Sequence, residues 1–269
     1  MKSRNLQYRD KSITVFGEDS YFDRLGADTL SHLERACDIA IGPGSVCVDV
    51  GANIGLTALY LANIVGPSGN VYAFEPVPAT FSFLRESVSH SGLNNIRAFQ
   101  VALGSSISRL RFRDRRSFSS GNSAFLQSSE LNTLSPTVDV SCVTLDSFSL
   151  LNGLAKIDLV KIDVEGFETD VLEGGEFSLA TFAPWVLLEF NHFCIGVNRE
   201  ISPMVAFRQI RSVFKTIAYY SRKDKKYILI ENDEDAVNFI RGNILTSDVD
   251  DLLCTNKEGG AAEILSKQV

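Results

Sequence analysis

Acidic residues close four apolar runs of this 269-residue sequence. Each run is typical of a buried strand in a parallel sheet. Ligands of an open α/β sheet bind beyond the carboxyl ends of its strands, so four such groups could meet in one crevice. A crevice lined by carboxylates favours a positively charged ligand. The four residues are Asp49, Glu75, Asp163 and Glu189.

The first of these runs, residues 46–50, leads into a glycine loop. Gly51 and Gly55 stand where the chain must turn sharply and where a ligand can approach the backbone. Residues 57–62 (TALYLA) then have helical character. A strand, a glycine loop and a helix begin a nucleotide-binding α/β unit, in which the helix N-terminus faces the ligand.

The spacing of this loop disfavours a dinucleotide. The fingerprint G-x-G-x-x-G requires glycine where this chain has Asn53 and Leu56, and the charge of Asp49 would repel a pyrophosphate. S-adenosyl-L-methionine carries a sulfonium and an ammonium and no phosphate, so it is the cofactor that the loop favours. Glu75, twenty residues after Gly55, ends a second strand and is expected to bind ribose hydroxyls. The alternative is an ordinary βαβ unit with a turn glycine and a solvated glutamate.

Composition and charge narrow the class of protein. A net charge of −7 argues against nucleic acid as the main partner, because phosphate backbones bind basic surfaces. No apolar stretch is long enough to predict a membrane span, and the polar N-terminus has no signal-peptide core. The five cysteines are scattered and the three histidines lie far apart, so we expect a cytoplasmic protein without a metal site.

The order of predicted elements indicates a doubly wound α/β sheet. Residues 42–104 have the pattern β-α-β-α-β, which is half of such a sheet. Residues 213–220 and 226–231 predict an antiparallel hairpin, because only a short charged turn joins them. Strands are also predicted at 13–16, 138–143, 157–163 and 184–190, and helices at 27–41, 168–179 (interrupted at Gly174) and 202–212.

Residues 104–135 differ in composition, being dense in serine with a run of arginines. Residues 109–113 (RLRFR) alternate strictly, so a strand there would place three guanidinium groups on one face. One interpretation is a solvated edge strand that its charge protects from aggregation. The other is a substrate-side loop that binds an acidic group such as a carboxylate or phosphate. The candidates for binding substrate are Arg113, Arg115, Arg116, Asn122 and Ser123.

Four segments together resemble the FkbM family of S-adenosylmethionine-dependent methyltransferases. They are DVGANIG at 49–55, FEP at 74–76, TLD at 144–146 and KIDVEGFE at 161–168. The resemblance implies a class I methyltransferase, with a Rossmann-like, doubly wound, seven-stranded sheet whose last two strands form a C-terminal antiparallel hairpin. It also implies O-methylation of a hydroxyl on a sugar or other small natural product.

The order of predicted elements divides the chain, and the resemblance, which spans roughly residues 40–195, implies a set of cofactor residues. Residues 1–41 become an N-terminal strand and helix extension packed on the core, 42–246 the S-adenosylmethionine-binding domain with 104–135 as a substrate-side insertion, and 247–269 a C-terminal tail. The residues expected to bind the cofactor are Asp49, Gly51, Ala52, Asn53, Gly55, Thr57, Glu75, Pro76, Val101, Ala102 and Asp163.

Methyl transfer to a hydroxyl requires alignment and the removal of a proton. The sulfonium is an excellent leaving group, so much of the catalysis can come from in-line positioning. A base helps the hydroxyl to lose its proton, and the candidates are His192, Asp163, Glu165 and Glu189. Histidine has the most suitable ordinary pKa, although a lone histidine beside a strand end is often structural. Glu165 could instead cap the next helix.

The expected partner is a small hydroxyl acceptor, and the arginines suggest that it is acidic or sugar-linked. Two other functions remain open. One is an adenosyl-binding regulatory or inactive relative, which the intact acidic residues oppose. The other is a nicotinamide-dependent oxidoreductase, which Asn53 and Leu56 oppose.

Overall fold

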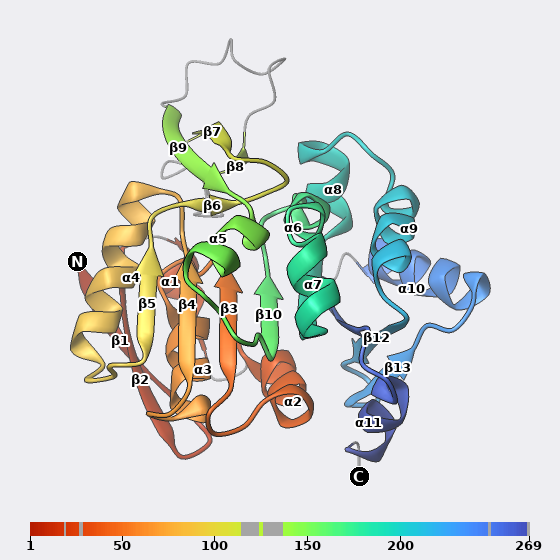
Figure 1. Cartoon of the computed structure of the whole chain (residues 1–269), viewed down its shortest axis with the longest axis horizontal. Helices are drawn as coiled ribbons and strands as arrows, with labels where there is room; N and C mark the ends of the chain where they lie inside the picture. Colours follow the sequence, from red (N-terminus) through yellow and green to blue (C-terminus); the bar gives the residue numbers. More distant parts are fainter. Residues whose placement is uncertain (19, 27–28, 114–123, 126–136, 247–248, 268–269) are drawn as a thin grey trace.

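An eight-stranded sheet forms the centre of the computed structural model (Figure 1). The structure describes residues 1–18, 20–26, 29–113, 124–125, 137–246 and 249–267. Five neighbouring strands run parallel, in the order β11 (Trp185–Phe190), β10 (Leu159–Ile162), β3 (Val46–Val50), β4 (Asn70–Phe74) and β5 (Ile96–Phe99). Beyond β11 the sheet continues with β14 (Asp250–Thr255), β12 (Thr216–Ser221) and β13 (Lys226–Leu229).

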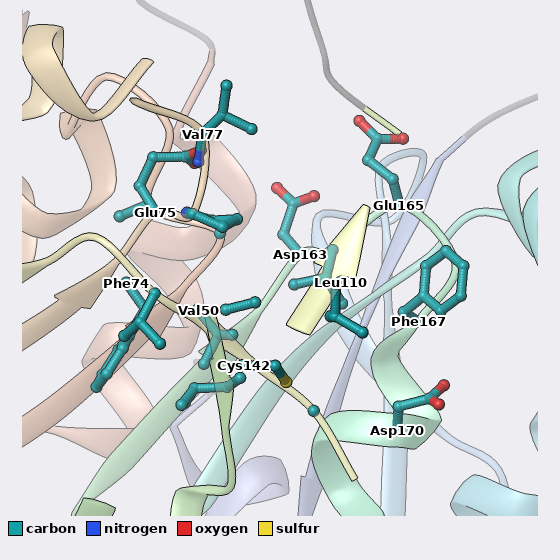
Figure 2. Close-up of a pocket in the computed structure, with 18 of the residues that line it drawn as sticks. Val50, Phe74, Glu75, Val77, Leu110, Cys142, Asp163, Glu165, Phe167 and Asp170 are labelled. Carbon is teal, nitrogen blue, oxygen red and sulfur yellow. The ribbon is translucent and has the colours of Figure 1, made fainter. Parts of the chain in front are cut away.

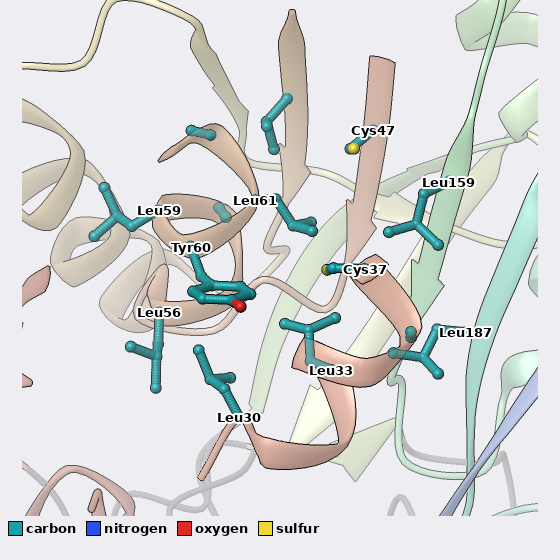
Figure 3. Close-up of a cluster of buried hydrophobic side chains, with 14 of the residues drawn as sticks. Leu30, Leu33, Cys37, Cys47, Leu56, Leu59, Tyr60, Leu61, Leu159 and Leu187 are labelled. Atoms are coloured by element: carbon teal, nitrogen blue, oxygen red, sulfur yellow. The ribbon is translucent and has the colours of Figure 1, made fainter. Parts of the chain in front are cut away.

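One face of the sheet packs on elements from the first third of the chain and on the last helix. These are the hairpin of β1 (Lys2–Tyr8) and β2 (Lys11–Gly17), the helices α1 (Ser20–Arg24), α2 (Ser31–Ala40), α3 (Leu56–Val65) and α4 (Pro78–His90), and α11 (Gly260–Ser266). Leu33 and Cys37 of α2 and Tyr60 of α3 meet Cys47 and Leu159 of the sheet in a buried cluster (Figure 3). This burial explains why the sequence here is apolar on both sides of each strand.

The opposite face packs on helices from the second half of the chain. They are α5 (Leu145–Leu151), α6 (Glu168–Glu173), α7 (Glu176–Phe182), α8 (His192–Asn198), α9 (Pro203–Val213) and α10 (Asp233–Thr246). Val48 and Val50 belong to this second core, whereas Cys47 belongs to the first, as the alternation of a strand requires.

The TLD segment acts as a structural junction between two of these helices. Thr144 and Ser147 form a capping box at the start of α5. The carboxylate of Asp146 accepts hydrogen bonds from the backbone N–H groups of Phe177 and Ser178, at 3.0 and 2.7 Å. This segment therefore positions α5 against α7 and does not line the cavity described below.

Most predicted elements are present, and the α/β prediction is confirmed. The strand at 13–16 lies within β2, the helix at 27–41 is α2, and the interruption at Gly174 separates α6 from α7. The hairpin is formed by β12 and β13. Residues 96–103, expected to be one strand, divide into β5 and β6 (Ala102–Leu103), which belong to different sheets.

Two expectations for the C-terminal region were wrong. The sheet has eight strands instead of seven, and residues 250–255 are a strand within it instead of part of a tail. β14 runs antiparallel between β11 and β12, with Leu252, Leu253 and Cys254 fully buried. Its acidic start concealed it, because Asp250 and Asp251 are held by partners from distant elements, Asn243 and His32.

A second, four-stranded sheet has the order β6-β9-β7-β8, with β7 (Ser108–Arg113), β8 (Ala124–Phe125) and β9 (Thr137–Val143). It lies above the parallel strands in Figure 1, at their carboxyl ends. β7 runs antiparallel to β9 along its whole length. Within the described residues, no helix has the length and apolar character needed to cross a membrane.

Candidate active site

A cavity of about 410 Å³ lies beyond the carboxyl ends of β3, β4 and β10 (Figure 2). From β3 the chain continues to its neighbour β4 on one side, whereas β10 is the neighbour of β3 on the other side. The cavity therefore lies where the strand order reverses, which is where ligands bind in doubly wound sheets. The small sheet covers the cavity with Ser108, Leu110 and Cys142. The sequence-predicted residues that line it are Gly51, Ala52, Asn53, Thr57, Glu75, Pro76, Val101, Ala102, Asp163, Glu165 and Glu189.

At the floor of the cavity, the backbone of the glycine loop lies directly against the backbone of Asp163. Gly51 has φ of +80°, and a Cβ at this position would collide with the carbonyl oxygen of Asp163. The N–H groups of Gly51 and Ala52 both donate to the carbonyl of Phe74, at 3.0 and 2.9 Å. Gly55, with φ of +96°, begins α3 and does not line the cavity. Only a residue without a side chain fits the Gly51 position.

Asp49 is buried beneath this loop, outside the cavity lining. Its side chain is fully inaccessible, and neither carboxylate oxygen makes a hydrogen bond of normal geometry. Burial raises the pKa of Asp49 to about 6, although the nearby Lys161 ammonium and the Ala58 backbone N–H oppose that rise. Asp49 therefore lies behind the glycine loop and does not face the cavity.

Glu75 lines the cavity at the end of β4. Its two carboxylate oxygens accept hydrogen bonds from the backbone N–H groups of Val77, at 2.9 Å, and Asn53, at 3.1 Å. Burial raises the pKa of Glu75 to about 7 despite these two bonds. The carboxylate is thus fixed between two loops and keeps lone pairs for further donors.

Lys161 and Asp163 form an ion pair at the end of β10, where Nζ and Oδ2 lie 2.8 Å apart. The Lys161 side chain is 10% exposed. Burial lowers the pKa of Lys161, but Asp163, Asp49 and Glu189 outweigh this and hold its pKa above the ordinary value. Lys161 was not among the sequence candidates, although it belongs to the KIDVEGFE segment. It is the counter-charge of this acidic region.

The loop after β10 is fixed by two glutamates with different roles. Glu168 is buried, and its Oε1 accepts hydrogen bonds from the N–H groups of Val164 and Gly166, at 3.2 and 3.0 Å. Glu165 has φ of +57° and accepts a hydrogen bond from the thiol of Cys194 at 2.9 Å. Glu165 lines the cavity, and its hydrogen bond from Cys194 connects it to α8. The start of α6 has no side-chain cap, so the helix-capping alternative for Glu165 was wrong.

Glu189 has a buried carboxylate oxygen, Oε2, without a hydrogen-bond partner. Burial is the main cause that raises its pKa well above the ordinary value, and Asp163, Glu165 and Asp251 add to it. Asp251 stands opposite Glu189 on β14 and binds His32 of α2 at 2.9 Å. The sequence analysis assigned residues 247–269 to a tail. It therefore did not predict that Asp251, with its partner His32, stands opposite Glu189.

His192 lies outside the cavity lining. Its Nδ1 is 2.7 Å from Oδ1 of Asn243 on α10, and Asn243 in turn donates to the carbonyl of Phe190. These contacts join α8, α10 and β11. Among the four candidate bases, the structure therefore brings Asp163, Glu165 and Glu189 together at the cavity and leaves His192 apart.

The alternation of β7 turns Arg109 and Arg111 away from the cavity. Ser108, Leu110 and Phe112 line the cavity, whereas Arg109 and Arg111 on the other face are exposed. Arg111 pairs with Asp139 of β9 at 2.8 Å. The side chain of Arg113 and the candidates Arg115, Arg116, Asn122 and Ser123 lie outside the described residues.

Three cavity residues that the sequence did not single out lie at the end opposite Glu75. Figure 2 shows Phe167 and Asp170 on the far side of Asp163 from Glu75. Arg199, the residue that ends α8, forms an ion pair with Asp170 at 3.2 Å and lies over the ring of Phe167. No sequence motif indicates Arg199. It reaches the cavity through the packing of α9 against both α8 and α6, which the sequence does not predict.

The doubly wound sheet, with an acidic cavity at its switch point, defines a Rossmann-like methyltransferase. Residues 49–229 match the methyltransferase FkbM domain, so the chain belongs to the FkbM methyltransferase family. It is therefore an S-adenosyl-L-methionine-dependent methyltransferase, and both the suspected family and the expected cofactor are confirmed.

The curated relatives are methyltransferases with various acceptors. Methyltransferase 1 of Beauveria bassiana is 29% identical over 205 residues, which are 62% of this chain and 80% of the relative. The 31-O-demethyl-FK506 methyltransferase FkbM of Streptomyces tacrolimicus is 30% identical over 162 residues, 51% of this chain and 62% of the relative. The 2-O-methyltransferase NoeI of Sinorhizobium fredii is 25% identical over 201 residues, 71% of this chain and 80% of the relative.

Among solved structures, the chain is similar in fold to methyltransferase FkbM from Methylobacillus flagellatus, with a TM-score of 0.46 and 13% identity. That likeness covers 79% of this chain and 44% of the other. An S-adenosylmethionine-dependent O-methyltransferase from Thermotoga maritima also has a TM-score of 0.46, at 11% identity, over 92% of this chain and 68% of the other.

The residues present fit the cofactor. The backbone cradle at Gly51 leaves no room for a Cβ, Glu75 and Asp163 line the cavity, and both oxygens of Asp49 are buried without hydrogen-bond partners. Carboxylates in this arrangement complement a ligand with a sulfonium and an ammonium. The apolar walls supplied by Phe74, Val101 and Leu103 suit an adenine ring.

Proposed function

We propose that this methyltransferase O-methylates a small acceptor, a sugar or another natural product, at a hydroxyl group. The supporting observation is a single cavity that has a cofactor-like end at Glu75 and continues past Asp163 to a second end at Phe167 (Figure 2). Relatives named as O-methyltransferases support the same reaction class. Five free cysteines, four of them buried, support a cytoplasmic location, which cell fractionation would check.

In this proposal the glycine-loop end holds the cofactor. Gly51, Ala52 and Asn53 would face its amino-acid part, Glu75 would accept the ribose hydroxyls, and Val101 and Ala102 would contact the adenine. When bound, S-adenosylmethionine supplies an electrophilic methyl group on a sulfonium. Asp49 and Asp163, balanced by Lys161, stabilise that positive charge without direct participation in the chemistry.

We assign the proton-accepting role to Oε2 of Glu189. Asp163 is already paired with Lys161, and Glu165 already accepts the Cys194 thiol. Glu189 is the remaining candidate at the cavity whose oxygen lacks a partner, and its raised pKa makes its carboxylate a stronger base than an ordinary glutamate. The acceptor hydroxyl would donate its proton to this oxygen while the cavity walls exclude water.

Calorimetric titration with S-adenosylmethionine, S-adenosylhomocysteine and NADH, followed by transfer of a labelled methyl group to hydroxylated acceptors, tests the proposal. We expect the adenosyl ligands to bind and a hydroxyl to be methylated. Glu189→Gln should lower kcat by about 100-fold or more while leaving S-adenosylhomocysteine affinity within about twofold. Glu263→Gln, an exposed glutamate paired with Lys267, is the matched control.

Other outcomes would redirect the proposal. Adenosyl binding without turnover on any acceptor would favour an inactive or regulatory relative. Methylation of nitrogen or carbon instead of oxygen would retain the enzyme class and refute the acceptor chemistry. Full activity of Glu189→Gln would move the base to Asp163 or Glu165.

A further inference from the structure

The cavity end opposite Glu75 contains a fixed arginine–aspartate pair. Nη2 of Arg199 lies 3.2 Å from Oδ2 of Asp170, and the two side chains are 31% and 22% exposed. The guanidinium carbon is 5.3 Å from the centre of the Phe167 ring, a cation–π contact that holds the guanidinium plane in place. All three residues line the cavity.

This pair leaves one donor and one acceptor unused. Nε of Arg199 and Oδ2 of Asp170 are buried and have no hydrogen-bond partner, because the 3.2 Å ion-pair contact is not aligned as a hydrogen bond. Burial of a polar atom without a partner is unfavourable, so such atoms in a native protein require an explanation. A ligand that accepts from the guanidinium and donates to the carboxylate would satisfy both.

Hydroxyl groups meet that requirement, since each one both donates and accepts. Two hydroxyls on neighbouring carbons of a sugar ring could bind the two charged groups at once. The apolar side chains of Leu110 and Phe112 lie in the same cavity and provide surface for the C–H groups of a ring. The arrangement therefore suits a ring that carries adjacent hydroxyls.

The charge of the cavity disfavours an acidic acceptor. Among the described lining residues, the carboxylates are Glu75, Asp163, Glu165, Asp170 and Glu189, and the cations are Lys161 and Arg199. Each cation already faces a carboxylate, at 2.8 Å for Lys161 and 3.2 Å for Arg199. The described lining residues therefore offer a uronate or phosphate no uncommitted positive charge, and their carboxylates would repel it.

We propose that Asp170 and Arg199, oriented by Phe167, form a subsite for an uncharged vicinal diol of the acceptor. The inference rests on the proposed O-methylation and names its substrate class as a neutral sugar. It replaces the acidic acceptor suggested by the arginines of residues 109–116, because, among the arginines whose side chains the structure describes, the one that lines the cavity is Arg199, and its charge is balanced by Asp170.

Saturation-transfer NMR on the complex with S-adenosylhomocysteine tests the subsite without requiring turnover. The probes are neutral methyl hexosides, the same glycosides lacking one hydroxyl, and the corresponding methyl uronates. We expect saturation transfer from the protein to the neutral diols. The affinity of the protein for the deoxy compounds should be about tenfold lower, and so should the affinity of Asp170→Asn and Arg199→Gln for the diols, because each change removes a hydrogen bond to a charged group.

Matched controls separate this subsite from a general loss of structure. Arg211→Gln and Asp233→Asn remove the exposed Arg211–Asp233 pair, which has the same residue types, and should leave diol binding unchanged. S-adenosylhomocysteine affinity of every variant reports whether the fold and the cofactor end are intact. A variant that loses S-adenosylhomocysteine affinity is not informative about the subsite. In that case, the comparison of diol and deoxy probes on the unsubstituted protein still tests whether the subsite binds a diol.

The inference fails if uronates bind at least as well as neutral glycosides, if the deoxy probes bind equally, or if no neutral glycoside binds. None of these results would affect methyl transfer to some other hydroxyl compound, which the labelled-methyl assay measures separately. Conversely, diol binding without methylation would keep the subsite and refute the proposed reaction.

Discussion

The ammonium of Lys161 lies 2.8 Å from Oδ2 of Asp163 at the carboxyl end of β10. Burial raises the pKa of Asp49, whose own oxygens have no hydrogen-bond partner, and the same ammonium limits that rise. One buried lysine thus offsets carboxylates from β3, β10 and β11. The acidic crevice is stable because this cation lies within it.

Replacement of Lys161 by methionine should destabilise the protein, because it leaves buried carboxylates without a counter-charge. We expect a loss of about 3 kcal/mol in the free energy of unfolding, measured by urea denaturation at pH 7. The double variant Lys161→Met, Asp163→Asn should recover part of this loss. Simple additivity of the two single changes would show that the pair is not coupled.

Substitutions at two glycines with positive φ distinguish the effect of backbone strain from the effect of close packing. Gly66→Ala, at φ of +64° with open space around it, should cost about 1–2 kcal/mol. Gly51→Ala adds a collision with the carbonyl oxygen of Asp163, so it should cost more than Gly66→Ala and weaken S-adenosylhomocysteine binding about tenfold or more. Equal effects of the two substitutions on stability and binding would contradict the cradle at Gly51.

Stability and cofactor affinity should depend on pH through Glu75. Burial raises the pKa of Glu75 from 4.5 to about 7. The folded protein therefore holds this proton more tightly than the unfolded chain, and its contribution to stability falls as pH rises from 4.5 to 7. The ligand-free protein should thus lose part of its stability across this range, and Glu75→Gln should reduce the loss, as measured by urea denaturation.

Binding should show the opposite trend. A cationic cofactor favours the charged form of Glu75, so affinity should increase as pH rises through 7, with release of protons. Calorimetry in buffers of different ionisation enthalpy measures that release. An unchanged proton count in Glu75→Gln would show that the protons come from other groups, such as Asp49.

Leucines in the last segment test whether β14 is part of the core. Leu253 is fully buried, whereas Leu265 is 55% exposed on α11. Leu253→Ala should lower the free energy of unfolding by about 2–5 kcal/mol. Leu265→Ala should change it by about 0.5 kcal/mol or less. Similar small effects at both positions would indicate a peripheral tail.

The sequence was sufficient for local features with a strong physical signature. A buried strand followed by glycine predicts the turn at Gly51, because few other residues adopt that φ without strain. Glu75 and Asp163 were predicted at the crevice because parallel strands end at one edge of the sheet. Their presence in the cavity lining agrees with this reasoning, and their contacts with the cofactor stay predictions.

Tertiary structure decided the features that depend on distant partners. β14 was missed because Asp251 is held by an ion pair with His32 and Asp250 by a hydrogen bond from the Asn243 amide, which no local pattern indicates. His192 is separated from the cavity by its bond to Asn243. Arg199 reaches the cavity because α9 packs against both α8 and α6. The sequence alone therefore determined the fold class and the residues at the Glu75 end of the cavity, because these residues follow the neighbouring strands β3 and β4. The end at Arg199 depends on helices whose relative positions only side-chain packing fixes.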